Sequence, residues 1–168
     1  MKIEEKLYFA YGSNMNLDQM AYRCPAAEAV CTAKLEGYEL FFAGRPGNGI
    51  AGIRPKQGGA VEGVLWKLTQ TCEKSLDHYE GFPVLYGKET VRVRGSDGTE
   101  RRVMAYTMQE PYSRIPAMPS MGYLAGILAG CDQNGIDEKS ILRAVLNTDH
   151  ELSVFEKRQP HVKKDRER

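Results

Sequence analysis

The sequence Tyr8-Phe9-Ala10-Tyr11-Gly12-Ser13-Asn14-Met15 runs without a linker from an apolar, strand-like segment into a turn, and a polar, helix-compatible segment follows. A strand that ends on such a turn leaves backbone N–H groups unpaired. Gly12 allows the backbone to approach a ligand closely, while Ser13 and Asn14 add a hydroxyl and an amide. The pattern therefore predicts a turn able to hold an anion or a developing oxyanion. The alternative is a tight strand-to-helix turn in which Ser13 or Asn14 caps the next helix.

A second candidate site lies in Leu76-Asp77-His78-Tyr79-Glu80-Gly81-Phe82-Pro83. From Thr71 onward, apolar residues recur at spacings of four and three, which predicts a short amphipathic helix that ends at Gly81; these residues are Cys72, Leu76 and Tyr79. Glu80 lies four residues after Leu76, so we expect its carboxyl near the buried face. Burial and the negative end of the helix dipole both favour the protonated form, which suits proton transfer near neutral pH. The alternative is a solvated glutamate in the last helical turn.

Together with Pro119-Ser120-Met121-Gly122-Tyr123-Leu124, these two segments resemble the gamma-glutamylcyclotransferase family, which includes the gamma-glutamylamine cyclotransferases and their bacterial relatives. Residues 33–42 and 58–66 carry a weaker similarity, so the resemblance covers most of residues 7–146. It implies an α+β fold with a small mixed, largely antiparallel β-barrel-like sheet and flanking helices.

The resemblance also implies a reaction. Members of this family act on γ-glutamyl amides: the free α-amine attacks the δ-carbonyl, a five-membered ring closes, and 5-oxoproline leaves together with a free amine or amino acid. Such a reaction needs a base, an acid, donors for an oxyanion and a pocket that holds the substrate curled. The alternative is a non-catalytic domain that binds the same small ligand in the same pocket.

The site residues follow from the same resemblance. The family glutamate that makes both proton transfers corresponds to Glu80. The positions expected to contact substrate are Tyr8, Phe9, Ala10, Tyr11, Gly12, Ser13, Asn14 and Tyr123. No metal ion and no organic cofactor is expected.

The composition is consistent with an enzyme that acts on small molecules. The 168 residues include 23 basic and 22 acidic side chains, and a net charge of +1 gives no electrostatic signature of nucleic-acid or membrane binding. The charged start at residues 1–6 is not followed by a signal peptide or membrane span, so we expect a cytoplasmic protein. Four cysteines without a C-x-x-C pair and only three histidines predict free thiols and no metal cluster.

The remaining elements are predicted from periodicity and turn residues. Residues 44–59 contain many glycines and are expected to form a loop with a short strand near 50–54. We expect helices at 16–23, 121–129 and 138–146, the last two capped by Ser120 and Asp137, and strands at 33–42, 61–68, 90–94 and 101–107.

The chain length fits one domain, predicted over residues 1–150. Residues 151–168 are mostly charged and are expected to form a mobile tail. The expected partner is a small γ-glutamyl substrate, with a homodimer as an open alternative.

Overall fold

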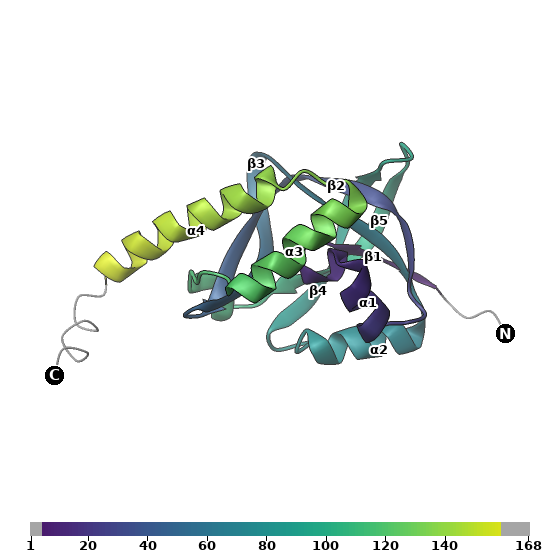
Figure 1. The fold of residues 1–168 in the computed structure, drawn as a ribbon, viewed down its shortest axis with the longest axis horizontal. Coiled ribbons are helices and arrows are strands. Elements are labelled where there is room, and N and C mark those ends of the chain that lie inside the picture. The colour runs from purple at the N-terminus through teal and green to yellow at the C-terminus, as the bar shows by residue number, and fades with distance from the viewer. Residues whose placement is uncertain (1–4, 159–168) are drawn as a thin grey trace.

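The computed structural model describes residues 5–158, and its centre is a closed five-stranded barrel (Figure 1). The strand order around the barrel is β1-β3-β2-β4-β5. One pairing, β1 with β5, is parallel and the others are antiparallel. The predicted mixed, largely antiparallel barrel with flanking helices is therefore confirmed. The strands are β1 (Lys6–Ala10), β2 (Glu28–Arg45), β3 (Asn48–Leu68), β4 (Tyr86–Gly95) and β5 (Glu100–Met108).

Four helices and two short 3-10 turns accompany the barrel in the described range. The turn η1 (Ser13–Met15) links β1 to α1 (Leu17–Arg23), and η2 (Tyr112–Arg114) follows β5. The other helices are α2 (Gln70–Tyr79), α3 (Met121–Asn134) and α4 (Lys139–Lys157). None of the helices formed by residues 5–158 is both long enough and apolar enough to cross a membrane.

Strands β2 and β3 form one long hairpin, so the predicted loop over residues 44–59 is wrong. The pairing continues to Arg45 opposite Asn48, and the turn between them uses Gly47 at φ 75°. Three of the six glycines in this segment allow close packing: Gly49, Gly52 and Gly59. A Cβ atom at Gly52 would lie 2.5 Å from the Phe41 ring, and one at Gly49 would lie 1.9 Å from the Ala117 carbonyl oxygen. Glycine inside a strand often marks such a close approach of another backbone or side chain.

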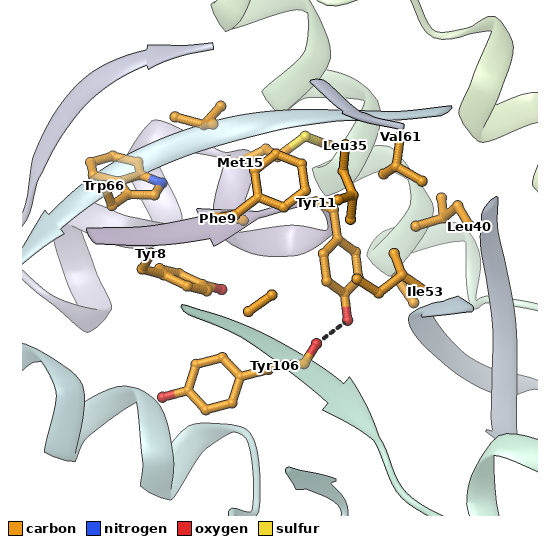
Figure 2. Packing of buried hydrophobic residues seen from close by; sticks show 14 of the residues in the cluster. Tyr8, Phe9, Tyr11, Met15, Leu35, Leu40, Ile53, Val61, Trp66 and Tyr106 are labelled. Carbon is orange, nitrogen blue, oxygen red and sulfur yellow. Dashed lines mark hydrogen bonds between the residues drawn. The ribbon is translucent and has the colours of Figure 1, made fainter. Parts of the chain in front are cut away.

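The core fills the barrel and extends beneath the helices (Figure 2). Tyr8, Phe9 and Ala10 are buried in succession, because both faces of β1 are covered. This double burial explains why the strand reads as a continuous apolar run. Inside the core, the Tyr11 hydroxyl donates a 2.5 Å hydrogen bond to the Tyr106 carbonyl oxygen, which satisfies a polar group that would otherwise be costly to bury (Figure 2).

The helix starts show which polar side chains act as caps. Helix α1 is capped by Asn16, whose Oδ1 accepts from the N–H groups of Asp18 and Gln19 at 3.0 Å. The alternative in which Ser13 or Asn14 caps this helix is therefore wrong. Ser120 caps α3 as predicted, since its Oγ accepts from the Tyr123 N–H at 3.2 Å.

Helix α2 agrees with the prediction except on one residue. Its body ends at Tyr79, and Gly81 follows at φ 62°. Cys72 and Leu76 are buried as expected, but Tyr79 is 46% exposed because it turns toward α1 instead of the core.

Helix α4 is longer than the predicted helix over residues 138–146. It starts at Lys139, whose N–H donates to Asp137 Oδ1 at 2.9 Å, and it continues to Lys157. The predicted boundary at residue 150 falls inside this helix, because the partly buried Leu152 and Phe155 continue its apolar spacing. Figure 1 shows the second half of α4 extending away from the barrel. The remainder of the predicted tail, residues 159–168, lies outside the described residues.

Candidate active site

A small cavity opens where β1 passes into η1, with about 290 Å³ of open space that includes its mouth. Six segments of the chain meet there: the β1–η1 turn, β3, the end of α2, β4, β5 and α3. Five of the lining residues are tyrosines, and one is acidic. The lining residues are Tyr8, Tyr11, Gly12, Ser13, Asn14, Ala51, Glu80, Tyr86, Tyr106 and Tyr123.

The turn at Gly12 forms the floor of this site. A Cβ atom at Gly12 would lie 3.2 Å from Ala51 Cβ and 3.6 Å from the Tyr123 hydroxyl, so a larger residue would crowd the cavity. Ser13 and Asn14 are buried in η1, directly after this glycine. The first N–H groups of a helical turn have no acceptor within the turn. Their position beside the cavity makes them candidate donors to a bound anion.

Glu80 lies at the end of α2 with its side chain in the cavity lining. Its Oε1 accepts a hydrogen bond of 3.2 Å from Asn14 Nδ2. Burial raises the pKa of the Glu80 carboxyl to about 7, although the positive charge of Arg23 and the hydrogen bond from Asn14 both lower it. The alternative of a fully solvated glutamate does not describe this residue. A carboxyl with a pKa near neutrality can take and return a proton at physiological pH.

Three of the five tyrosine hydroxyls donate their protons to protein acceptors. Tyr11 donates to the Tyr106 carbonyl, Tyr86 to the Ala51 carbonyl and Tyr106 to Asp77 Oδ1, each at 2.5 Å. These bonds fix the walls of the cavity.

The other two hydroxyls act as acceptors. Tyr8 accepts from Asn14 Nδ2 and Tyr123 from the Ala51 N–H, both at 3.0 Å. Within residues 5–158, no hydrogen bond donated by either hydroxyl is found. Burial raises the pKa of both groups above the usual tyrosine value, so each stays protonated and can donate to a ligand.

The structure brings most of the predicted site residues together. Tyr8, Tyr11, Gly12, Ser13, Asn14, Glu80 and Tyr123 all line the cavity. Phe9 and Ala10 do not line it: they are fully buried in the barrel wall and pair with Leu65 and Val64. The strand alternation explains the position of Phe9, because its side chain points to the face opposite that of Tyr8.

Sequence reasoning missed four residues. Ala51, Tyr86 and Tyr106 line the cavity, and Arg23 donates to two lining side chains. Tyr86 and Tyr106 lie on β4 and β5, where a tyrosine in a strand carries no local signal of a site. Arg23 ends a short helix and resembles an ordinary last-turn arginine.

The part of the chain that the structure describes contains no group of three or more histidine, cysteine, aspartate or glutamate side chains arranged to hold a metal ion. What the cavity does offer is one carboxyl that titrates near neutrality, two free hydroxyl donors and an N–H-rich turn. These groups suit acid-base chemistry on a small neutral or zwitterionic molecule.

Comparison with known proteins gives consistent matches. The family model described as Gamma-glutamyl cyclotransferase, AIG2-like, matches residues 8–125. The gamma-glutamylcyclotransferase of Homo sapiens is 33% identical over 171 residues, which cover 96% of this chain and 89% of that protein. The Mus musculus protein of the same name is 30% identical with the same coverage. A solved structure named gamma-glutamyl cyclotransferase has a TM-score of 0.72 and 34% identity, and the match covers 79% of this chain and 81% of that one.

Proposed function

The chain belongs to the gamma-glutamyl cyclotransferase, AIG2-like, family, and we propose that it converts a γ-glutamyl compound into 5-oxoproline and a free amine or amino acid. The observation that carries this proposal is Glu80. It is the acidic residue of the cavity lining, and burial raises its pKa to about 7. A domain that only binds its ligand has no need of a carboxyl tuned to this range.

The proposed reaction begins with the ionised Glu80 carboxylate. It takes a proton from the substrate α-ammonium group, and a carboxylate whose pKa is raised to about 7 is a better base for this transfer than an ordinary glutamate. The freed amine attacks the δ-carbonyl carbon, and the carbonyl oxygen becomes an oxyanion. When this intermediate collapses, the bond to the leaving nitrogen breaks as protonated Glu80 gives its proton to that nitrogen. The ring nitrogen then loses its second proton through the same carboxylate to the released amine, which leaves as an ammonium ion. No water is consumed.

The cavity offers donors for the other steps. The N–H groups of the Tyr11-Gly12-Ser13 turn are proposed to hold the substrate, and the hydroxyl of Tyr8 to assist them. The free hydroxyl proton of Tyr123 is proposed to contact the ligand from α3. Tight walls favour a curled substrate, which brings the amine close to the carbonyl. The cytoplasmic location and the homodimer stay predictions.

Replacement of Glu80 tests the proposal. Glu80→Gln keeps the shape of the side chain but removes the proton acceptor, so we expect turnover to fall about 10²- to 10⁴-fold. Turnover is measured as 5-oxoproline released across a panel of γ-glutamyl amino acids, peptides and amines. Calorimetry should show that the variant still binds the ligand, since the proposed contacts come from the turn.

Glu73→Gln is the matched control. Glu73 lies on the same helix but pairs with Lys6 and Lys88 outside the cavity lining, so its replacement should leave turnover close to that of the wild type. Unchanged turnover in Glu80→Gln would refute the assignment of the base. Ligand binding without any 5-oxoproline from the wild type would favour the binding-domain alternative.

A further inference from the structure

Arg23 lies at the end of α1, between the η1 turn and the end of α2. Its Nη1 donates to Asn14 Oδ1 at 2.6 Å and to Ser13 Oγ at 3.2 Å. Its Nη2 donates to the Tyr79 hydroxyl at 2.7 Å, and the guanidinium stacks 3.8 Å from the centre of the Tyr79 ring. Arg23 is not part of the cavity lining. It contacts the η1 turn, which carries the Asn14 donor to Glu80, and Tyr79, which precedes Glu80 in the chain.

The contact with Asn14 fixes the orientation of an amide. Because Asn14 Oδ1 accepts from Arg23, Asn14 Nδ2 faces the opposite side, where it donates to Tyr8 and to Glu80. A flipped amide would turn its oxygen toward the Glu80 carboxylate and its NH2 group toward the Arg23 guanidinium, and both of those hydrogen bonds would be lost. The Arg23 guanidinium therefore ensures that the NH2 group of Asn14, a hydrogen-bond donor, faces the Glu80 carboxylate.

Arg23 is also the charged group that acts most directly on Glu80. The cavity lining around the carboxyl contains five tyrosines from β1, the β1–η1 turn, β4, β5 and α3, and burial raises the pKa of each above its usual value; they are Tyr8, Tyr11, Tyr86, Tyr106 and Tyr123. These groups stay neutral. On α2 itself, Asp77 pairs with Lys88 at 2.9 Å. No carboxylate within residues 5–158 lies within 4.0 Å of Arg23.

We propose that Arg23 is a positioning residue for Glu80: it orients the Asn14 amide toward the carboxylate and supplies the positive charge that keeps this carboxylate ionised near neutral pH. The proposal rests on the proposed function only where it treats Glu80 as the base. Its competitor is a purely structural role, in which Arg23 joins α1 to α2 through Tyr79 and through the Ser75 hydroxyl, which donates to the Arg23 carbonyl.

The test uses variants that separate the positive charge of Arg23 from its structural role in joining α1 to α2. Arg23→Gln and Arg23→Met both remove the charge, and either one suffices if the other does not fold. Arg23→Lys keeps the charge. Tyr79→Phe removes the hydrogen bond between the helices but leaves Arg23 and its charge in place. Arg94→Gln controls for net charge, since Arg94 pairs with Glu100 on the exposed β4–β5 hairpin.

The first readout is independent of catalysis. The Glu80 carboxyl carbon is followed by NMR against pH in each variant and assigned with Glu80→Gln. Loss of the Arg23 charge should raise the pKa of Glu80, because an opposite charge nearby favours the ionised form. Arg23→Lys should lie closer to the wild type than Arg23→Gln. Tyr79→Phe and Arg94→Gln should leave the Glu80 titration unchanged, although Tyr79→Phe should lower the melting temperature.

The second readout is kcat/KM against pH for 5-oxoproline release. At pH 6, kcat/KM of Arg23→Gln should be about tenfold lower than that of the wild type. Above pH 8 the difference between the two should become smaller, because Glu80 is then ionised in both proteins. A Glu80 titration that is the same in the wild type and in the folded charge-removing variants would overturn the proposal. A shifted titration in a protein that releases no 5-oxoproline would support the positioning role and refute the proposed function.

Discussion

Asn14 links the η1 turn to four side chains. Its Nδ2 donates to Tyr8 and Glu80, its Oδ1 accepts from Arg23, and its backbone carbonyl accepts from Trp66 Nε1 at 3.0 Å. Because both polar atoms of its side chain are hydrogen-bonded, the Asn14 amide has one stable orientation. The donor that meets Glu80 is therefore held in place before any ligand arrives.

The raised pKa of Glu80 predicts that the stability of the protein depends on pH. Its pKa is raised from 4.5 to about 7 on folding, so the folded protein binds this proton more tightly than the unfolded chain does. The resulting stability is fully present below about pH 4.5 and is lost as pH rises through about 7. Relative to the wild type, Glu80→Gln should therefore be more stable at pH 8 than at pH 5, by up to about 3 kcal/mol.

Urea unfolding of both proteins at the two pH values measures this difference. Glu73→Gln should behave in the opposite way. Burial raises the pKa of Glu73, but the hydrogen bonds from Lys88 and Lys6 lower it more, so the stability from Glu73 is lost as pH falls. An unfolding difference between wild type and Glu80→Gln that does not change with pH would contradict the buried environment of Glu80.

Among the elements, α3 holds the η1 turn against the barrel. Asn134 Nδ2 donates to the Met15 carbonyl and Asn16 Nδ2 donates to the Gly126 carbonyl, both at 2.9 Å. Gly130 allows this approach, since a Cβ atom there would lie 2.8 Å from the Asn16 nitrogen and 3.0 Å from the Met15 carbonyl carbon. The position of the cavity floor therefore depends on a glycine far from the cavity in sequence.

Gly130→Ala should push α3 away from η1. We expect a loss of about 1 to 3 kcal/mol in unfolding free energy, the usual cost of overpacking, and reduced turnover because η1 carries Asn14. Gly122→Ala on the same helix is the control: nothing lies within 4 Å of its Cβ position, so it should be neutral or stabilise by up to about 1 kcal/mol. Chemical denaturation compares the two variants. Equal effects at both positions would show that packing against η1 is not the cause.

Over the whole molecule, the barrel is closed by unequal seams. β2 and β3 pair along most of their length, and β4 pairs with β5 over nine residues from Tyr86 opposite Met108. The parallel seam between β1 and β5 is defined by one register pair, Tyr8 with Met104. The β2–β4 seam has two register pairs, and Tyr8 lines the cavity, so the seam with the fewest register pairs lies beside the site.

Hydrogen exchange should reveal this inequality. Amides of β1 and β5 that face the short seam should exchange faster than those of the β2–β3 and β4–β5 ladders, because local opening there breaks fewer hydrogen bonds. Amide exchange followed by NMR measures each seam separately. Equal protection of the amides from exchange in all seams would contradict the interpretation that the β1–β5 seam opens most easily.

The features that could be read from the sequence are local ones. The strand into the Gly12 turn, the helix before Glu80, the β4–β5 hairpin and the Ser120 cap each depend on residues a few positions apart. The extent of the β2–β3 hairpin could not be read, because a glycine that fits against Phe41 looks the same in sequence as a glycine in a loop. The end of α4 was missed because charged residues surround its apolar spacing.

The cavity itself depends on contacts between distant parts of the chain. Asn14 meets Glu80 across 66 positions, and Tyr11 meets Tyr106 across 95. Residue type and local spacing establish that a glutamate ends a helix and that a glycine turn ends a strand. Only closure of the barrel and the docking of α1, α2 and α3 bring Arg23, Asn14 and Glu80 together, and burial there raises the pKa of Glu80. Desolvation and orientation are properties of the packed structure, so no local pattern can encode them.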